Sequence, residues 1–135
     1  MDINVREYQS DDFDAVHSIL MDSFSVSKKE FHGDCFCELV ATIDSVVVGY
    51  LLLTKVLNPI IDRYYYLVDY VCVDSKYRNL GIGKKMLEMA YQVAKENSAI
   101  YLQLTCSTFR VVAHKLYESC GFVKRESDIF RKEIV

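Results

Sequence analysis

The sequence predicts an α/β fold in which one mixed β-sheet carries helices on both of its faces. Segments with the two-residue period of strands alternate along the chain with segments that have the period of amphipathic helices, and strands outnumber helices. The chain has 135 residues, which is the usual size of one compact domain. Apolar residues make up 51% and charged residues 26%, a composition typical of a globular protein. We therefore expect a single domain covering residues 1–135.

The N-terminal half is predicted to contain four strands and one helix. Residues 3–8 alternate between apolar and polar side chains and predict the first strand. Ser10 is the expected cap of a helix whose apolar stripe consists of Phe13, Val16, Leu20 and Phe24. Residues 25–33 are polar and mixed, which predicts a loop or a short helix. Residues 35–43 and 45–56 predict two strands joined by a tight turn, and residues 64–73 predict a long, β-rich strand.

The C-terminal half is predicted to contain two helices and three strands. Residues 81–95 have a helical apolar stripe, and residues 100–105 predict a short strand. Residues 112–120 predict a second helix, which Gly121 ends. Residues 122–125 and 129–134 predict a closing pair of strands.

Charge, cysteine content and hydropathy exclude several classes of protein. The net charge of -3 argues against a dedicated nucleic-acid binder, which usually presents a basic face. The start of the chain lacks the pattern of a signal peptide, and the longest apolar run, Val46–Leu53, is far shorter than the roughly twenty residues of a membrane span. The five cysteines are odd in number, and four of them lie in apolar or alternating stretches, so we expect buried free thiols and a cytoplasmic protein. No second Cys/His pair follows Cys35 and Cys37 at a zinc-like spacing, so no metal site is predicted.

The segment from Val71 to Lys84 has the pattern of a phosphate-binding loop. A predicted strand runs into a loop that contains Gly81 and Gly83 and then into an amphipathic helix. The start of a helix leaves backbone N–H donors unpaired and carries a partial positive charge, so it binds phosphate well. Arg78 and Lys84 flank the loop and can add charge-assisted hydrogen bonds. On these residues alone, an ordinary tight turn between strand and helix explains the pattern equally well.

Two common nucleotide motifs do not fit this segment. The dinucleotide fingerprint G-x-G-x-x-G fails at its third glycine, where Met86 stands. The nucleoside-triphosphate loop fails because Arg78 replaces its first glycine and Lys85 replaces its Ser or Thr.

The loop resembles the acetyl-CoA loop of the GNAT superfamily of N-acetyltransferases, whose pattern is R/Q-x-x-G-x-G/A. The matching residues are Arg78, Gly81 and Gly83. A second segment is similar to the family's R-x-x-A-H-x-F-Y-E-x-x-G-F pattern, with the matching residues Arg110, Ala113, His114, Tyr117, Glu118, Gly121 and Phe122 and with Leu116 in place of its phenylalanine. The resemblance implies a mostly antiparallel sheet with splayed strands at the acetyl-CoA site.

The resemblance also implies which residues bind the cosubstrate acetyl-CoA. Its pantetheine arm would pair with the backbone of Val71, Cys72 and Val73, and its pyrophosphate would lie against the loop residues Arg78, Asn79, Leu80, Gly81, Ile82, Gly83 and Lys84. Asn79 departs from the glycine that is frequent in the family, although its backbone donor remains. Arg110, the first residue of the second motif, is included among the cofactor-binding residues.

Two residues are the candidates for proton transfer. Tyr117 matches the family tyrosine that protonates the departing thiolate of CoA. Asp69 is the candidate base, because Asp is disfavoured in strands and this one lies in a β-rich run, predicted on the same face as Leu67, Val71 and Val73. There are structural alternatives for both residues. The Tyr117 ring can pack in the core, and Asp69 can be solvated or paired with a nearby arginine. His114 is expected to pack or to make a local hydrogen bond.

The acceptor is expected to be a primary amine of a small molecule or of a peptide or protein. By the resemblance, residues 24–34 and 124–128 would line its cleft, and the tyrosines between residues 64 and 70 would add aromatic walls. A non-catalytic acyl-CoA-binding regulator of the same fold is the alternative function, and an unrelated phosphate-ligand binder is a third. The sequence does not decide whether the chain acts alone or as a homodimer.

Overall fold

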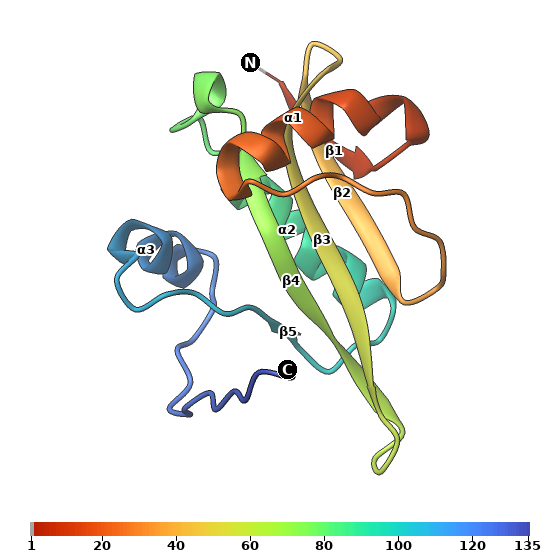
Figure 1. Cartoon of the computed structure of the whole chain (residues 1–135), viewed down its shortest axis with the longest axis vertical. Helices are drawn as coiled ribbons and strands as arrows, with labels where there is room; N and C mark the ends of the chain where they lie inside the picture. The colour runs from red at the N-terminus through yellow and green to blue at the C-terminus, as the bar shows by residue number, and fades with distance from the viewer. Residues whose placement is uncertain (1) are drawn as a thin grey trace. The chain divides into compact units, whose positions relative to one another are not determined.

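The computed structural model describes residues 2–135 and divides the chain into two compact units, Met1–Thr105 and Cys106–Val135. The first unit contains β1 (Ile3–Glu7), α1 (Phe13–Phe24), β2 (Phe36–Ile43), β3 (Val46–Asn58), β4 (Arg63–Val73), α2 (Ile82–Glu96) and β5 (Leu102–Gln103). The second unit contains α3 (Val111–Ser119). Figure 1 labels these elements, and the two units are described separately below.

The sheet of the first unit has the strand order β1-β2-β3-β4-β5. Neighbouring strands from β1 to β4 are antiparallel, whereas β4 and β5 are parallel. The parallel step is possible because the connection through α2 carries the chain back across the sheet. The prediction of a mixed, mostly antiparallel sheet is confirmed.

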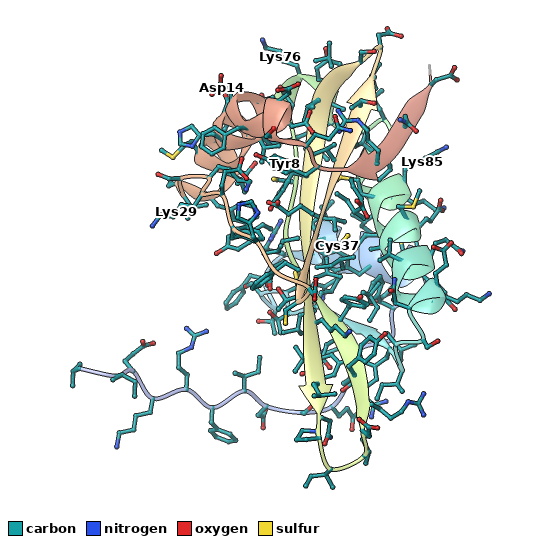
Figure 2. The ribbon with its side chains drawn as sticks, turned by 90° about the vertical axis from the view of Figure 1, so that its right-hand side faces the viewer. Tyr8, Asp14, Lys29, Cys37, Lys76 and Lys85 are labelled. Atoms are coloured by element: carbon teal, nitrogen blue, oxygen red, sulfur yellow. The ribbon has the colours of Figure 1, made fainter. Side chains whose placement is uncertain are left out.

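The helices α1 and α2 cover opposite faces of this sheet, as Figures 1 and 2 show. On the α1 face, Val16 and Ile19 join Tyr50 of β3 and Cys72 of β4 in one buried cluster. On the α2 face, Gly49 of β3 leaves room for the helix, because a Cβ atom at this position would lie only 3.0 Å from Sδ of Met86. Burial of these two faces supplies the apolar core, and it fixes which side chains of β3 and β4 face each helix.

The entry to α1 differs from the predicted one. Ser10 does not cap α1, because residues Ser10–Asp12 form a short 3₁₀ helix before it. The backbone N–H of Gln9 donates to the Asp12 carboxylate at 2.8 Å, and the Arg6 guanidinium donates to both Asp12 oxygens at 2.8 and 3.0 Å. The buried Asp12 therefore joins β1 to the start of α1, which is the work expected of a cap.

The C-terminal strands are the largest departure from the predicted elements. The expected strand over residues 100–105 is reduced to Leu102–Gln103, and the strands expected over residues 122–125 and 129–134 are absent from the described chain. An alternating pattern specifies which side chains would share a face, but a strand also needs a hydrogen-bonded partner. Residues 122–135 have no such partner within the described residues.

The structure also tests the expectations about buried thiols and about membrane-spanning segments. All five cysteines are free, but only Cys72 is buried, so the expectation of four buried thiols was wrong. Within residues 2–135, no helix combines the length and the hydropathy needed to cross a membrane.

We expect the Asp12→Asn substitution to lower the free energy of unfolding by about 2 kcal/mol at neutral pH, the usual value of hydrogen bonds to a charged group. The hydrogen bonds from Arg6 hold the pKa of Asp12 below its ordinary value of 3.8, against the opposing effect of burial. A lowered pKa adds stability above the unfolded-state pKa, and this stability disappears as the pH falls through the folded-state pKa. Urea unfolding at several pH values should therefore show a difference between the two proteins that is full at neutral pH and shrinks below pH 3.8.

The exposed Asp14, in the first turn of α1, provides the matched control. Asp14→Asn should change the stability by less than about 0.5 kcal/mol. An Asp12→Asn difference that stayed constant down to pH 2 would contradict the proposed role of the ion pair.

Candidate active site

In strand β4, the alternation of side chains between the two faces of the sheet is interrupted at Tyr70. This interruption shapes the candidate site. Tyr70 has a positive φ of 56°. On one side of it Asp69 pairs with Leu52, and on the other side Cys72 pairs with Tyr50. Two residues of β4, Tyr70 and Val71, therefore lie opposite the single residue Leu51, which is the pattern of a β-bulge.

The bulge corrects the predicted surroundings of Asp69. Directly paired residues share a face of the sheet, so Asp69 lies on the α1 face with Leu52, whereas Val73 lies on the α2 face with Gly49. Asp69 thus does not share a face with Val71 and Val73, as uninterrupted alternation had predicted. Its side chain is exposed, which agrees with the alternative of a solvated carboxylate.

The second half of β4 has one edge without a neighbouring strand in the first unit. The pairing with β5 involves only Tyr66 and Leu67 of β4, so it ends before Val71, Cys72 and Val73. Free N–H and C=O groups on a strand edge can pair with an extended ligand. Burial raises the pKa of the Cys72 thiol to about 12, so this side chain is an unreactive part of the core and only its backbone is available.

The loop after β4 is held in shape by its own backbone. The N–H of Asp74 donates to the Val48 carbonyl at 2.8 Å, and the Asp74 carboxylate accepts from the N–H of Lys76 at 2.9 Å. Asn79 and Gly81 have positive φ values of 63° and 83°. The left-handed conformation suits glycine and, among other residues, asparagine, which explains why Asn79 can replace a glycine here.

The loop ends at the exposed start of α2. The first hydrogen bond of this helix runs from the N–H of Lys85 to the Gly81 carbonyl at 3.1 Å. Among the described residues, the backbone N–H groups of residues 80–84 have no acceptor. Ile82 is 2% exposed and fixes the helix start in the core, while Arg78 and Lys84 are exposed.

The geometry of this segment suits an anionic ligand. Unpaired N–H groups and the positive end of the helix dipole face solvent at the same place. The basic side chains around the loop are Lys76, Arg78, Lys84 and Lys85, of which Lys76 and Lys85 are labelled in Figure 2. The predicted loop residues, from Arg78 to Lys84, thus form one continuous segment with the free edge of β4.

The second unit contains the other predicted site residues. Arg110 precedes α3, and Tyr117 lies in its last turn with its ring 6.1 Å from the ring of Phe122 in an edge-to-face arrangement. Burial raises the pKa of Tyr117, and Cys106 adds to the shift while Arg110 opposes it. The phenol is therefore protonated at neutral pH. His114 Nε2 lies 2.8 Å from the Ser107 carbonyl oxygen, a local hydrogen bond of the kind predicted for it.

Sequence analysis missed a buried polar network around Lys28 and Glu38. The Lys28 side chain is 2% exposed and its Nζ lies 2.8 Å from Oε1 of Glu38. The hydroxyl of Tyr50 donates to the same oxygen at 2.6 Å. The one signal in the sequence was Glu38 in a largely apolar strand, since a buried carboxylate needs a partner.

We expect Gly81→Ala to lower the free energy of unfolding by about 1–2 kcal/mol, the cost of placing an L side chain in the left-handed conformation. No atom lies within 4 Å of the position of the added Cβ, so steric overlap does not contribute. Gly81→Asn is the matched control, since asparagine tolerates positive φ better, and it should cost less than the alanine variant. Thermal or urea unfolding measures both, and an alanine variant as stable as the natural protein would show that the loop does not need the left-handed residue.

Comparisons with known proteins bear on the family of this chain. Residues 3–122 match the model of the acetyltransferase (GNAT) family. The chain is 30% identical over 93 residues to N-acetyltransferase family 8 member 3 of Rattus norvegicus, which covers 69% of this chain and 40% of that protein. It is 30% identical over 98 residues to N-acetyltransferase 8 of Homo sapiens, which covers 73% of this chain and 42% of the relative.

The chain therefore spans about two-fifths of the length of these curated relatives. Among solved structures, a transcriptional regulator from Bacillus halodurans C-125 has the same fold, with a TM-score of 0.85 at 21% identity over 98% of this chain and 100% of that one. The match of the family model over most of the sequence, together with the loop and the sheet described above, shows that this chain belongs to the acetyltransferase (GNAT) family.

Proposed function

We propose that this chain is an N-acetyltransferase domain, spanning residues 1–135, that transfers the acetyl group of acetyl-CoA directly to a primary amine. The observation that carries this proposal is the continuous segment from the free edge of β4 to the start of α2. This segment offers an extended pairing edge followed by a cluster of unpaired N–H donors and basic side chains. Acetyl-CoA has the matching sequence of groups, an amide-containing arm followed by a pyrophosphate.

Each part of the segment has a proposed partner in acetyl-CoA. The backbone of Val71, Cys72 and Val73 pairs with the amides of the pantetheine arm, as a strand would. The N–H groups of residues 80–84 donate hydrogen bonds to the pyrophosphate oxygens, and Arg78 and Lys84 add charge-assisted hydrogen bonds. Arg110 is proposed to bind the cosubstrate as well, on the strength of the family motif alone.

The chemical step requires two protons to be removed from the amine nitrogen and one to be supplied to the departing sulfur. A primary amine with a pKa near 10.4 must lose a proton before its nitrogen attacks the thioester carbonyl. The C–N bond then forms, the nitrogen gives up its second proton to water, the C–S bond breaks, and the thiolate that leaves takes up a proton. We assign the supply of that proton to Tyr117, whose raised pKa keeps it protonated at neutral pH.

Asp69 is the proposed base. Its exposed carboxylate lies next to the bulge in β4, beside the backbone proposed to bind the pantetheine arm. Solvent exposure allows it to act through a water molecule, and the proton it receives can leave to bulk water. The amine acceptor, whether a small molecule or a peptide or protein, is left to experiment, as are the proposed cytoplasmic location and homodimer formation.

The direct test is a thiol-release assay with acetyl-CoA over a panel of amines, amino acids, polyamines and peptides. An enzyme releases CoA in an amine-dependent manner. A non-catalytic acyl-CoA-binding regulator would be stabilised thermally by CoA but would release none with any acceptor. A binder of another phosphate ligand would prefer a nucleotide to CoA in competition calorimetry.

We expect Tyr117→Phe to lower kcat by about 100-fold, the usual contribution of a positioned general acid, and to leave the dissociation constant of acetyl-CoA unchanged. Loss of the hydroxyl removes the proton donor but keeps the ring packed against Phe122. Tyr91→Phe, at an exposed tyrosine of α2, is the matched control and should keep full turnover. Full turnover by the Tyr117→Phe enzyme would overturn the assignment of the acid.

A further inference from the structure

The β3–β4 hairpin extends beyond the rest of the sheet of the first unit. On one edge of the hairpin, the last backbone hydrogen bond from a neighbouring described segment runs from the N–H of Lys55 to the Cys35 carbonyl at 2.7 Å. On the other edge, the last one runs from the N–H of Ile100 to the Tyr64 carbonyl at 2.9 Å. Residues 57–63 therefore form a two-stranded arm that projects by roughly 10 Å, and Figure 1 shows this arm beyond the ends of the other strands.

The tip of this arm is apolar. The side chains of Leu57, Ile60 and Ile61 belong to residues that are 58%, 90% and 53% exposed. By contrast, Leu51 and Leu53 of the same hairpin are fully buried in the core. An exposed cluster of large branched side chains on a projecting tip is typical of a surface that is covered by a partner or by a membrane.

Two successive residues of the turn present no free backbone donor. Pro59 has no N–H, and the N–H of Ile60 donates to Oδ1 of Asn58 at 3.0 Å. In an apolar environment an unpaired N–H is costly, because no water is present to accept its hydrogen bond. In water the same pairing adds little, since water accepts the hydrogen bond instead. The backbone at the most projecting part of the arm is thus suited to entering an apolar phase.

Tyrosines and basic side chains lie directly behind the tip. The rings of Tyr65 and Tyr101 stack with their centres 4.7 Å apart, and the Nζ atom of Lys55 lies 4.1 Å from the centre of the Tyr64 ring. Arg63, at the start of β4, is exposed. Tyrosines are enriched at the boundary between the apolar interior of a bilayer and its head groups, and basic side chains are attracted to anionic head groups. The order of groups along the arm therefore matches the order of layers in a bilayer.

The size and the charge of the tip favour a membrane over a protein as its partner. A stable protein interface takes about 20–30 residues from each side, whereas the arm offers three large apolar side chains. Binding to a membrane surface requires only buried apolar area and attraction to anionic lipids. Between residues 55 and 63, Lys55 and Arg63 outnumber the single carboxylate of Asp62, so the arm carries a net charge of +1 although the whole chain carries -3.

We propose that the tip of the β3–β4 hairpin binds the surface of a membrane that contains anionic lipids. The three apolar side chains of the tip enter the apolar side of the head-group region, the tyrosines behind them lie at the boundary, and Lys55 and Arg63 contact the head groups. Strand β4 begins at this tip and ends at Val73, roughly 30 Å farther along, so the segment proposed to bind acetyl-CoA stays away from the bilayer. No residue of the tip belongs to that segment, so membrane binding does not depend on the proposed acetyl transfer.

The chain contains no tryptophan, which allows a direct test of insertion. An Ile60→Trp variant carries a single indole, whose emission shifts to the blue when the ring leaves water. Vesicles of equimolar phosphatidylcholine and phosphatidylserine should give a saturable blue shift, and lipids brominated in their acyl chains should quench the emission. Val46→Trp is the matched control, because Val46 is 52% exposed at the other end of β3, and its emission should stay that of a solvated indole.

Two results would overturn the proposal. One is an indole at position 60 whose emission does not respond to the vesicles. The other is a blue shift that grows with protein concentration in the absence of vesicles, which would show that a second copy of the chain covers the tip.

Removal of the anchors tests their contribution to binding. The combination of Ile60→Ser and Ile61→Ser should weaken co-sedimentation with these vesicles by a factor of about ten or more, because the apolar surface that leaves water is lost. Both residues are exposed, so the fold of the variant is expected to be unchanged. Val46→Ser is the matched control and should bind as the natural protein does. Equal binding of the double variant and the natural protein would show that the vesicles are bound elsewhere, which would overturn the proposal.

Vesicles of phosphatidylcholine alone test the role of the basic side chains. At low ionic strength, the net charge of the arm should make binding to the anionic vesicles about fivefold tighter than binding to the neutral ones. Arg63→Gln removes this net charge and should reduce the ratio toward one. Lys29→Gln, at an exposed lysine outside the arm, is the matched control and should keep the ratio. Equal binding of the natural protein to both kinds of vesicle would overturn the proposed recognition of anionic lipids.

Discussion

The positive φ of Tyr70 in the middle of β4 is the constraint on which the candidate site depends. It adds one residue to this strand opposite β3, so that side chains on either side of it face different helices. Asp69 and Cys72 therefore both lie on the α1 face although they are three residues apart, whereas Val71 and Val73 lie on the opposite face. The pairing with β5 ends at Leu67, before the bulge, so within the first unit the second half of β4 has one edge without a neighbouring strand.

The start of α2 depends on packing below the loop. Because Gly49 has no side chain, α2 lies close to β3. The side chains of Met86 and Ile82 occupy the space where a Cβ atom of residue 49 would lie. With Ile82 buried, the helix cannot shift along the sheet, and its first N–H groups remain at the edge of the core. The loop itself is short and is fixed by the two hydrogen-bonded turns at Asp74. The groups proposed to bind the pyrophosphate are therefore already oriented in the chain alone, which would lower the entropic cost of binding.

The sequence predicted the elements with strong local patterns and missed features that arise only from tertiary contacts. The sequence predicted the strands β2, β3 and β4, the helix α2 and the glycine loop. These elements have local signals, because hydrophobic periodicity and turn residues involve positions that are close in sequence. The sequence did not predict the bulge, since tyrosine has no intrinsic preference for positive φ. Tyr70 adopts this conformation only because the surrounding structure imposes it. The closing strands were predicted from alternation alone, and alternation does not provide a partner. Lys28, in a polar loop, gave no sign of burial because its partner Glu38 lies on a strand.

The buried pair of Lys28 and Glu38 has a consequence for how this fold can vary in sequence. Loss of either charge leaves the other one desolvated, whereas replacement of both by neutral residues of similar size is tolerated far better. Positions 28 and 38 should thus change together or not at all among related chains. A relative in which both had become apolar would keep the packing of this region without its buried charges, and the pair of positions would then mark that relative as part of a separate branch.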